Sequence, residues 1–164
     1  MTSEFKVVGT RQPLVDAWKK VTGAAVYGDD ITFPGMLHVR LLRSTLAHAK
    51  ILRIDTSRAA AAPGVRGIVT GADAKAKFGV LPISQDEEAL ATDKVRCVGD
   101  IVAAVAADDE LAAKRAVDLI EVVYERLPEC FDAEKGRQRV EAPVHAWTVD
   151  GTNIQKRVAQ HFGD

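Results

Sequence analysis

Histidine and cysteine are the residues of this 164-residue chain best suited to bind a metal or to act as nucleophiles. No two histidines show the i, i+4 spacing of a zinc-binding helix, and the cysteines form no C-x-x-C motif. Two thiolates are also too few for an ordinary iron–sulfur cluster. These residues are His38, His48, His145, His161, Cys97 and Cys130. We therefore assign no metal-binding residue.

A serine and a histidine four residues apart, Ser44 and His48 in "LRSTLAH", could form a nucleophile and its base. No glycines flank Ser44 as in a nucleophile elbow, and no third partner is evident. We expect the Ser44 hydroxyl to cap the end of a strand. A small hydrolase that uses this pair remains a separate hypothesis, which an esterase assay tests.

Adjacent acids occur at Asp29 and Asp30 and again at Asp86, Glu87 and Glu88. Neighbours on a strand point to opposite faces, and acids in turns are usually solvated, so we assign them neither metal binding nor acid–base chemistry. A strand rather than a helix follows the first two glycines of "PGVRGIVTG", which argues against a dinucleotide-binding loop. No catalytic or cofactor-binding residue is assigned to the chain.

The charge balance excludes two classes of partner. Lys and Arg number 22 against 23 Asp and Glu, and aromatic residues make up 5%. A nucleic-acid binder would show a basic face, and a membrane-surface binder would too, so we expect neither partner. The start "MTSEFKVVGTRQP" lacks the apolar core of a secretory signal, which predicts a cytoplasmic protein.

The elements that position these residues are clearest in "VGDIVAAVAADDELAAKRA". The apolar run 101–107 predicts a strand covered on both faces, and the acids from Asp108 to Glu110 predict the start of a helix. Small residues at helical spacing from Ala113 onward would let this helix lie close to a sheet. Three carboxylates in the first turn would repel a phosphate, so we interpret this corner as structural.

Short strands and helices alternate along the rest of the chain without long crossover units. This order predicts an α+β fold with a mixed sheet and short interleaved helices. The segments "MLHVRLLRS" and "AKILRID" could pair as antiparallel strands. Alternation in "KVRCV" would place Val95 and Cys97 on one buried face, whereas Cys130 follows a strand and could be exposed. From Asp132 onward the apolar periodicity fades into a connector.

The order of segments resembles a known family. "KVTGAAVYGDDITFPGMLHVRLLRSTLAHAKILRIDTSRAAAAPGVRGIVTGAD" and "LATDKVRCVGDIVAAVAADDELAAKRAVDLIEVVYERLP" resemble the α/β hammerhead domain at the N-terminus of the molybdenum-binding subunit in the xanthine dehydrogenase and aldehyde oxidase family. The stretch "FGVLPISQDEEALATDKVRCVGD" resembles the α subunit of 4-hydroxybenzoyl-CoA reductase, which removes an aromatic hydroxyl from a CoA thioester. Thr45 and Cys97 depart from the family pattern, where a proline and an aromatic residue are usual.

The resemblance implies that this chain and the polypeptide beyond it have different roles. Residues 1–131 would form the hammerhead domain, and residues 132–164 would be a connector and the start of a molybdopterin-binding domain. Molybdopterin would bind to downstream domains of the same chain, while partner subunits would carry [2Fe-2S] clusters and FAD. The family's cofactor-binding and catalytic motifs match no residue here, so this piece alone would be an inactive support.

The segment from Phe78 to Leu90 is the candidate contact with the iron–sulfur subunit, because it mixes apolar side chains with acids in an irregular stretch. A surface loop folded on its own domain is the alternative. A further alternative for the whole chain is an independent adaptor that binds protein or a small ligand. The candidate contact residues are Phe78, Val80, Leu81 and Ile83.

Overall fold

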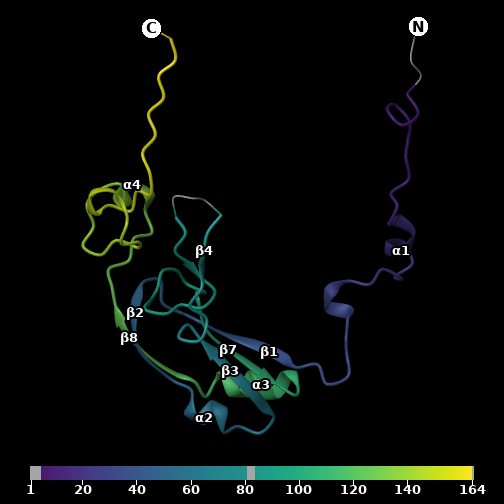
Figure 1. Ribbon diagram of the computed structural model, residues 1–164, viewed down its shortest axis with the longest axis horizontal. Helices are drawn as coiled ribbons and strands as arrows, with labels where there is room; N and C mark the ends of the chain where they lie inside the picture. Colours follow the sequence, from purple (N-terminus) through teal and green to yellow (C-terminus); the bar gives the residue numbers. More distant parts are fainter. Residues whose placement is uncertain (1–4, 81–83, 164) are drawn as a thin grey trace. The chain divides into compact units, whose positions relative to one another are not determined.

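The structure, a computed structural model, describes residues 5–80 and 84–163 (Figure 1). The chain divides into two compact units, one up to Met36 and the other from Leu37 onward. The first unit holds a short helix within "VDAWKKVTG", which ends at Val21, and Gly23 follows it with a positive φ of 70°. Nearly all of its described side chains are exposed. Its elements are α1 (Ala17–Val21) and the 3₁₀ helix η1 (Gly28–Asp30).

The second unit begins with a three-stranded sheet in the order β1-β7-β3. The central strand β7 is antiparallel to both neighbours, and Figure 1 shows the three strands side by side with α3 next to them. In β7 the residues Ala103, Val105 and Ala107 are buried, but Ala104 and Ala106 on the other face are only partly buried, so the predicted cover on both faces is incomplete. The bounds are β1 (His38–Arg43), β3 (Val65–Thr70), β7 (Ile101–Ala107), α2 (Ser57–Ala60) and α3 (Glu110–Val117).

A second sheet has the order β6-β2-β8, and again its central strand, β2, is antiparallel to both neighbours. A two-stranded hairpin pairs β4 with β5, in the segment that precedes β6. The bounds are β2 (Ala49–Asp55), β4 (Lys77–Phe78), β5 (Glu87–Glu88), β6 (Lys94–Val95) and β8 (Glu121–Arg126).

The α+β fold with short interleaved helices is confirmed, but two details of the predicted sheet are wrong. Every strand pair within residues 5–80 and 84–163 is antiparallel, so the expected mixture of parallel and antiparallel pairs is not found. The strands β1 and β2 do not pair with each other, because the chain after Arg43 leads β2 into a different sheet. The apolar strand β7 pairs with β1 instead, which gives β7 a hydrogen-bonded neighbour on each edge.

The corner between β7 and α3 forms as the sequence predicts. Asp109 caps the helix, since its side chain accepts a hydrogen bond of 2.8 Å from the backbone N–H of Ala112. Asp108 has a different partner: its two carboxylate oxygens accept hydrogen bonds of 2.7 and 2.8 Å from the guanidinium of Arg66. Ala113 and Ala116 on the helix are completely buried, which allows the close approach of α3 to β7.

Two clusters of small residues form the core. The first lies between α3 and the β1-β7-β3 sheet, and the second lies where Val102 of β7 meets Val95 of β6 and Ala49 of β2. Valines are the largest side chains that are fully buried in the described part of the chain. No helix in that part is long and apolar enough to cross a lipid bilayer.

The connector after β8 has structure of its own. It holds α4 (Ala133–Gly136) and the 3₁₀ helix η2 (Val149–Gly151), which backbone hydrogen bonds join. The N–H of Val140 donates to the carbonyl of Gly151 at 3.0 Å, and the N–H of Asn153 donates to the carbonyl of Gly136 at 2.8 Å. The apolar periodicity fades after Asp132, as predicted, because this connector consists of short turns held by backbone hydrogen bonds.

Gly71 follows β3 at a point where two backbones approach closely. A Cβ at this position would lie 2.6 Å from the carbonyl oxygen of Ala91. We expect Gly71→Ala to lower the free energy of unfolding by about 1–3 kcal/mol, the usual cost of overpacking. Gly67→Ala is the matched control, since a Cβ there meets nothing within 4 Å. Urea unfolding followed by circular dichroism measures both, and equal stability of the two variants would contradict the expectation.

Candidate functional site

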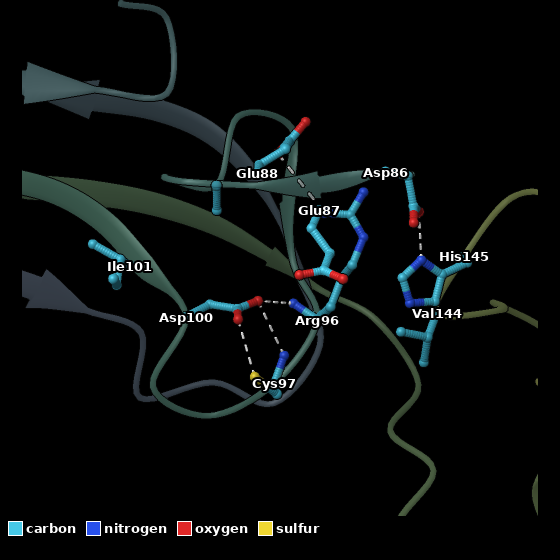
Figure 2. Close-up of a pocket in the computed structure, with 10 residues that line it drawn as sticks. Asp86, Glu87, Glu88, Arg96, Cys97, Asp100, Ile101, Val144 and His145 are labelled. Atoms are coloured by element: carbon cyan, nitrogen blue, oxygen red, sulfur yellow. Dashed lines mark hydrogen bonds and ion pairs between the residues drawn. The ribbon is translucent and has the colours of Figure 1, made fainter. Parts of the chain in front are cut away.

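The clearest candidate for a site in the described part of the chain is a cavity of about 390 Å³ (Figure 2). It lies where the segment around β5, the turn before β7 and the connector meet. Its lining combines four carboxylates with one guanidinium, one imidazole and one thiol. The lining residues are Asp86, Glu87, Glu88, Ala91, Arg96, Cys97, Asp100, Ile101, Val144 and His145.

The turn between β6 and β7 is organised by one carboxylate. Asp100 accepts hydrogen bonds at Oδ2 from the backbone N–H groups of Arg96, at 2.5 Å, and Cys97, at 3.2 Å. Its Oδ1 accepts a hydrogen bond of 3.0 Å from the thiol of Cys97, and this bond raises the pKa of that thiol above its ordinary value. The thiol is therefore less reactive as a nucleophile than an ordinary cysteine.

The predicted burial of Cys97 is wrong, because the side chain is exposed. The strand β6 ends at Val95, so the alternation expected to carry Cys97 to the buried face stops two residues earlier. Val95 itself is fully buried as predicted. Cys130 is exposed, in agreement with the sequence.

Glu88 is a largely buried carboxylate of the cavity, with a side chain only 7% exposed. It accepts hydrogen bonds from the hydroxyl of Thr92 at 2.7 Å and from the backbone N–H of Thr92 at 3.0 Å. Burial alone would raise the pKa of Glu88, but these bonds and the ammonium group of Lys77 together outweigh it and hold the pKa below its ordinary value. Glu88 is therefore ionised near neutral pH and serves as an anchor for the turn that follows it.

Asp86 ties the cavity wall to the connector. Its Oδ2 lies 2.6 Å from Nδ1 of His145 and accepts a hydrogen bond of 2.8 Å from the indole N–H of Trp147. We call these three residues the clasp. Burial would raise the pKa of Asp86, but the bonds from Trp147 and His145 hold it below its ordinary value.

A second polar contact holds the same connector. Nζ of Lys94 donates a hydrogen bond of 2.9 Å to the carbonyl oxygen of Pro143. Burial lowers the pKa of this lysine. Together with the clasp, this bond fixes residues 143–147 against the segment from β5 to β6.

The arrangement lacks the parts of a nucleophilic site. A carboxylate and the histidine that it orients are two of the three members of a catalytic triad, but no hydroxyl or thiol among residues 5–80 and 84–163 hydrogen-bonds to the ring of His145. The Cys97 thiol is bonded to Asp100 instead. The cluster therefore holds polypeptide segments together, and its chemistry is that of hydrogen bonding and charge pairing.

Ser44 and His48 are both buried but do not form a pair. The Ser44 hydroxyl donates to the carbonyl of Leu46 at 2.9 Å and accepts from the N–H of Leu46 at 3.0 Å. Nδ1 of His48 lies 2.8 Å from the carbonyl oxygen of Pro128. The expected cap at the strand end is confirmed for Ser44, which directly follows β1.

The other candidate residues are dispersed. Phe78 lies in β4 and is 52% exposed, and Val80 is 92% exposed, whereas Leu81 and Ile83 lie outside the described residues. Asp30 accepts a hydrogen bond of 2.9 Å from the backbone N–H of Tyr27. Across residues 5–80 and 84–163 no group of three His, Cys, Asp or Glu side chains could hold a metal ion.

Sequence reasoning assigned a role to no member of the clasp. Asp86 stands out in an acidic run, but its partners lie 59 and 61 residues away in a connector with no periodic pattern. The available signal was the close spacing of a histidine and a tryptophan in "VHAWT". Only the fold shows that this pair meets an acid.

We expect Asp86→Asn to lower the free energy of unfolding by about 2 kcal/mol at pH 7, as loss of hydrogen bonds to a charged group does. The folded pKa of Asp86 is lowered, so its contribution is complete above the unfolded carboxyl pKa of about 3.9 and is lost as the pH falls through the folded value. Urea unfolding of both proteins over this range measures the difference. A gap that persists unchanged below the folded pKa would contradict this account, and Glu87→Gln, at the neighbouring carboxylate, is the control.

Comparisons with known proteins agree with the fold. The family model described as "Aldehyde oxidase and xanthine dehydrogenase, a/b hammerhead domain" matches residues 22–128. The chain is 34% identical over its whole length to the nicotinate dehydrogenase large molybdopterin subunit of Eubacterium barkeri, of which it covers 38%. Over 76% of its length it is 42% identical to xanthine dehydrogenase of Oryza sativa subsp. japonica, of which it covers 9%.

Solved structures show the same similarity. Aldehyde oxidoreductase from Desulfovibrio gigas superposes with a TM-score of 0.75 at 32% identity, over 83% of this chain and 16% of that chain. Carbon monoxide dehydrogenase from Oligotropha carboxidovorans gives 0.73 at 37% identity, over 79% and 16%. The chain thus spans well under half the length of these relatives. It belongs to the aldehyde oxidase and xanthine dehydrogenase family, and the part that matches is the a/b hammerhead domain.

Proposed function

We propose that this chain is a supporting domain of a molybdenum-containing oxidoreductase and performs no redox chemistry itself. The observation that carries the proposal is the match of residues 22–128 to the hammerhead domain, combined with a cavity in which Asp86 and Asp100 are engaged in holding the fold. In this proposal the hammerhead domain spans residues 1–131, and residues 132–164 lead into the next domain. The end of the family match at residue 128 supports this division.

Molybdopterin would bind elsewhere in the longer protein, because the residues here do not fit it. The cofactor carries a phosphate group, and the cavity presents Asp86, Glu87, Glu88 and Asp100 against a single guanidinium, that of Arg96. Carboxylates repel an anion of this kind at close range. Iron–sulfur clusters and FAD would lie on partner subunits, and the contribution of this chain would be to position its neighbours.

The substrate of the longer protein is a separate and more specific proposal. The resemblance of residues 78–100 to 4-hydroxybenzoyl-CoA reductase favours an aromatic CoA thioester, which the enzyme would reduce. The relatives reported above are instead named for nicotinate, xanthine, aldehyde and carbon monoxide. The coarser proposal, a molybdenum oxidoreductase, does not depend on this choice.

We expect the longer protein encoded by the continuous reading frame, purified with its partners, to contain molybdenum in stoichiometric amount. Metal analysis by mass spectrometry measures the content, and assays with 4-hydroxybenzoyl-CoA, xanthine and nicotinate separate the substrates. The 164-residue chain alone is the control and should hold no molybdenum. Stoichiometric molybdenum in that short chain, or a frame that stops at Asp164, would contradict the proposal, and the latter would favour an adaptor.

We propose also that the segment from Phe78 to Leu90 contacts the iron–sulfur subunit. Support comes from two exposed apolar side chains, Phe78 in β4 and Val80 two residues after it. Exposed aromatic and aliphatic groups of this kind often mark protein interfaces.

Replacement of Phe78 and Val80 by alanine in the intact complex should weaken subunit assembly about 10-fold, as loss of an apolar anchor typically does. Sedimentation of the complex over a dilution series measures the change. Phe131→Ala is the control, because Phe131 is also exposed but lies after β8, outside this segment. Assembly as tight as that of the unaltered protein would remove this segment from the interface.

A further inference from the structure

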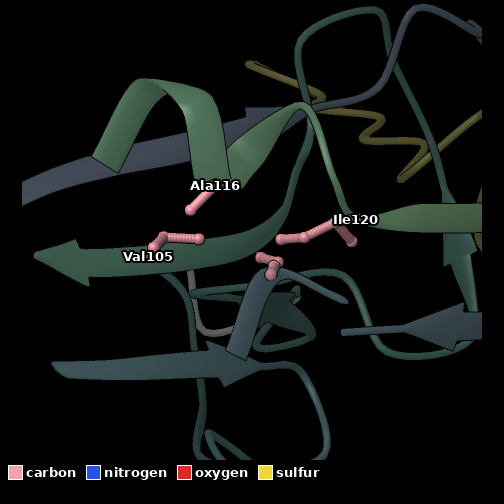
Figure 3. Packing of buried hydrophobic residues seen from close by; sticks show 5 residues of the cluster. Val105, Ala116 and Ile120 are labelled. Carbon is pink, nitrogen blue, oxygen red and sulfur yellow. The ribbon is translucent and has the colours of Figure 1, made fainter. Parts of the chain in front are cut away.

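The two faces of the β1-β7-β3 sheet are covered differently. On the inner face, Ala103, Val105 and Ala107 of β7 are fully buried, and Figure 3 shows Val105 close to Ala116 of α3. Leu42 of β1 and Ile68 of β3 pack against this same cluster. Because side chains alternate along a strand, the intervening residues point to the opposite face.

The opposite side, which we call the outer face, consists of two apolar rows. The strand register places Val39, Ala106 and Gly67 in one row, and Leu41, Ala104 and Val69 in the other. None of these six positions carries a charge or a hydrogen-bonding side chain. The large residues are 57%, 38% and 42% exposed at Val39, Leu41 and Val69.

The outer face continues directly from the second core cluster. Val102, the first position of β7 on this side, is fully buried among Ala49, Ala91 and Val95. Two residues further, Ala104 is only partly buried, and Ala106 is the same. The core therefore stops partway along β7, although the apolar surface does not.

We propose that the outer face is a docking surface for an apolar element of the longer polypeptide to which this domain belongs. The inference rests on the proposed function, since it takes the downstream domains of the same chain as the occupant. Gly67 and Ala106 form a shallow floor, and Val39, Leu41 and Val69 form its raised sides. A protruding apolar side chain would fill this surface and extend the second core cluster along β7.

The size of the outer face favours a tethered partner. A stable interface between separate proteins uses about 20–30 residues on each side, and this surface offers six positions. A segment of the same chain is held at high effective concentration and needs far less contact area. This domain covers only 16% of the length of the solved aldehyde oxidoreductase chain, so a related chain has ample polypeptide to supply the element.

Cysteine labelling in the longer protein tests the proposal. Val39→Cys and Leu41→Cys probe the outer face, and Leu111→Cys is the control, because Leu111 is 54% exposed on α3 and Val39 is 57% exposed. We expect a maleimide to modify the two outer-face thiols at least 10-fold more slowly than the Leu111→Cys thiol. Peptide mass spectrometry resolves each site from Cys97, Cys130 and any other native thiol.

Equal labelling at all three positions would overturn the proposal. Protection that disappears on dilution would overturn it in favour of a second copy, and protection that requires added partner subunits would overturn it in favour of those subunits. Slow labelling that is independent of concentration, in the large subunit alone, supports it. Molybdenum content is measured on the same sample, so failure of the proposed function is distinguishable from failure of the docking surface.

Discussion

Close packing between β7 and α3 is the constraint on which the described fold depends. On the strand, Ala103, Val105 and Ala107 face the helix. On the helix, Ala113 and Ala116 face the strand, and all five side chains are completely buried. Side chains this small bring two backbones together without gaps. A larger residue at any of these positions would push the helix from the sheet, and the edge strands β1 and β3 would lose the centre to which they are hydrogen-bonded.

Polar contacts then position the segments that the small apolar core does not hold. Arg66 and Asp108 join β3 to the end of β7, Glu88 anchors the turn before β6, and the clasp of Asp86, His145 and Trp147 holds the connector. The pair of Arg66 and Asp108 is largely exposed and contributes modestly to stability, whereas Glu88 and Asp86 are more buried and their hydrogen bonds contribute more. Their value here is geometric, because they set where the chain leaves the domain.

The sequence was sufficient for local structure and insufficient for pairing. The strand at Ile101–Ala107, the capped helix after Asp109 and the turn at Ser44 follow from periodicity and hydrogen-bonding groups close in sequence. The separation of β1 from β2 could not be predicted, since both show similar patterns and the choice of partner is made by β7. The exposure of Cys97 could not be predicted for a related reason: the strand β6 has two residues and ends too soon for alternation to apply.

The order of strands also has a consequence for how the domain is made. Strand β7 lies between β1 and β3 in space but follows both in the chain, so neither edge strand has its partner until the ribosome has released residue 107. During that interval the apolar side chains of the early strands remain in the nascent chain without a sheet to join. Protection by a chaperone would therefore be most useful after β1 and β3 are synthesised and before β7 is complete.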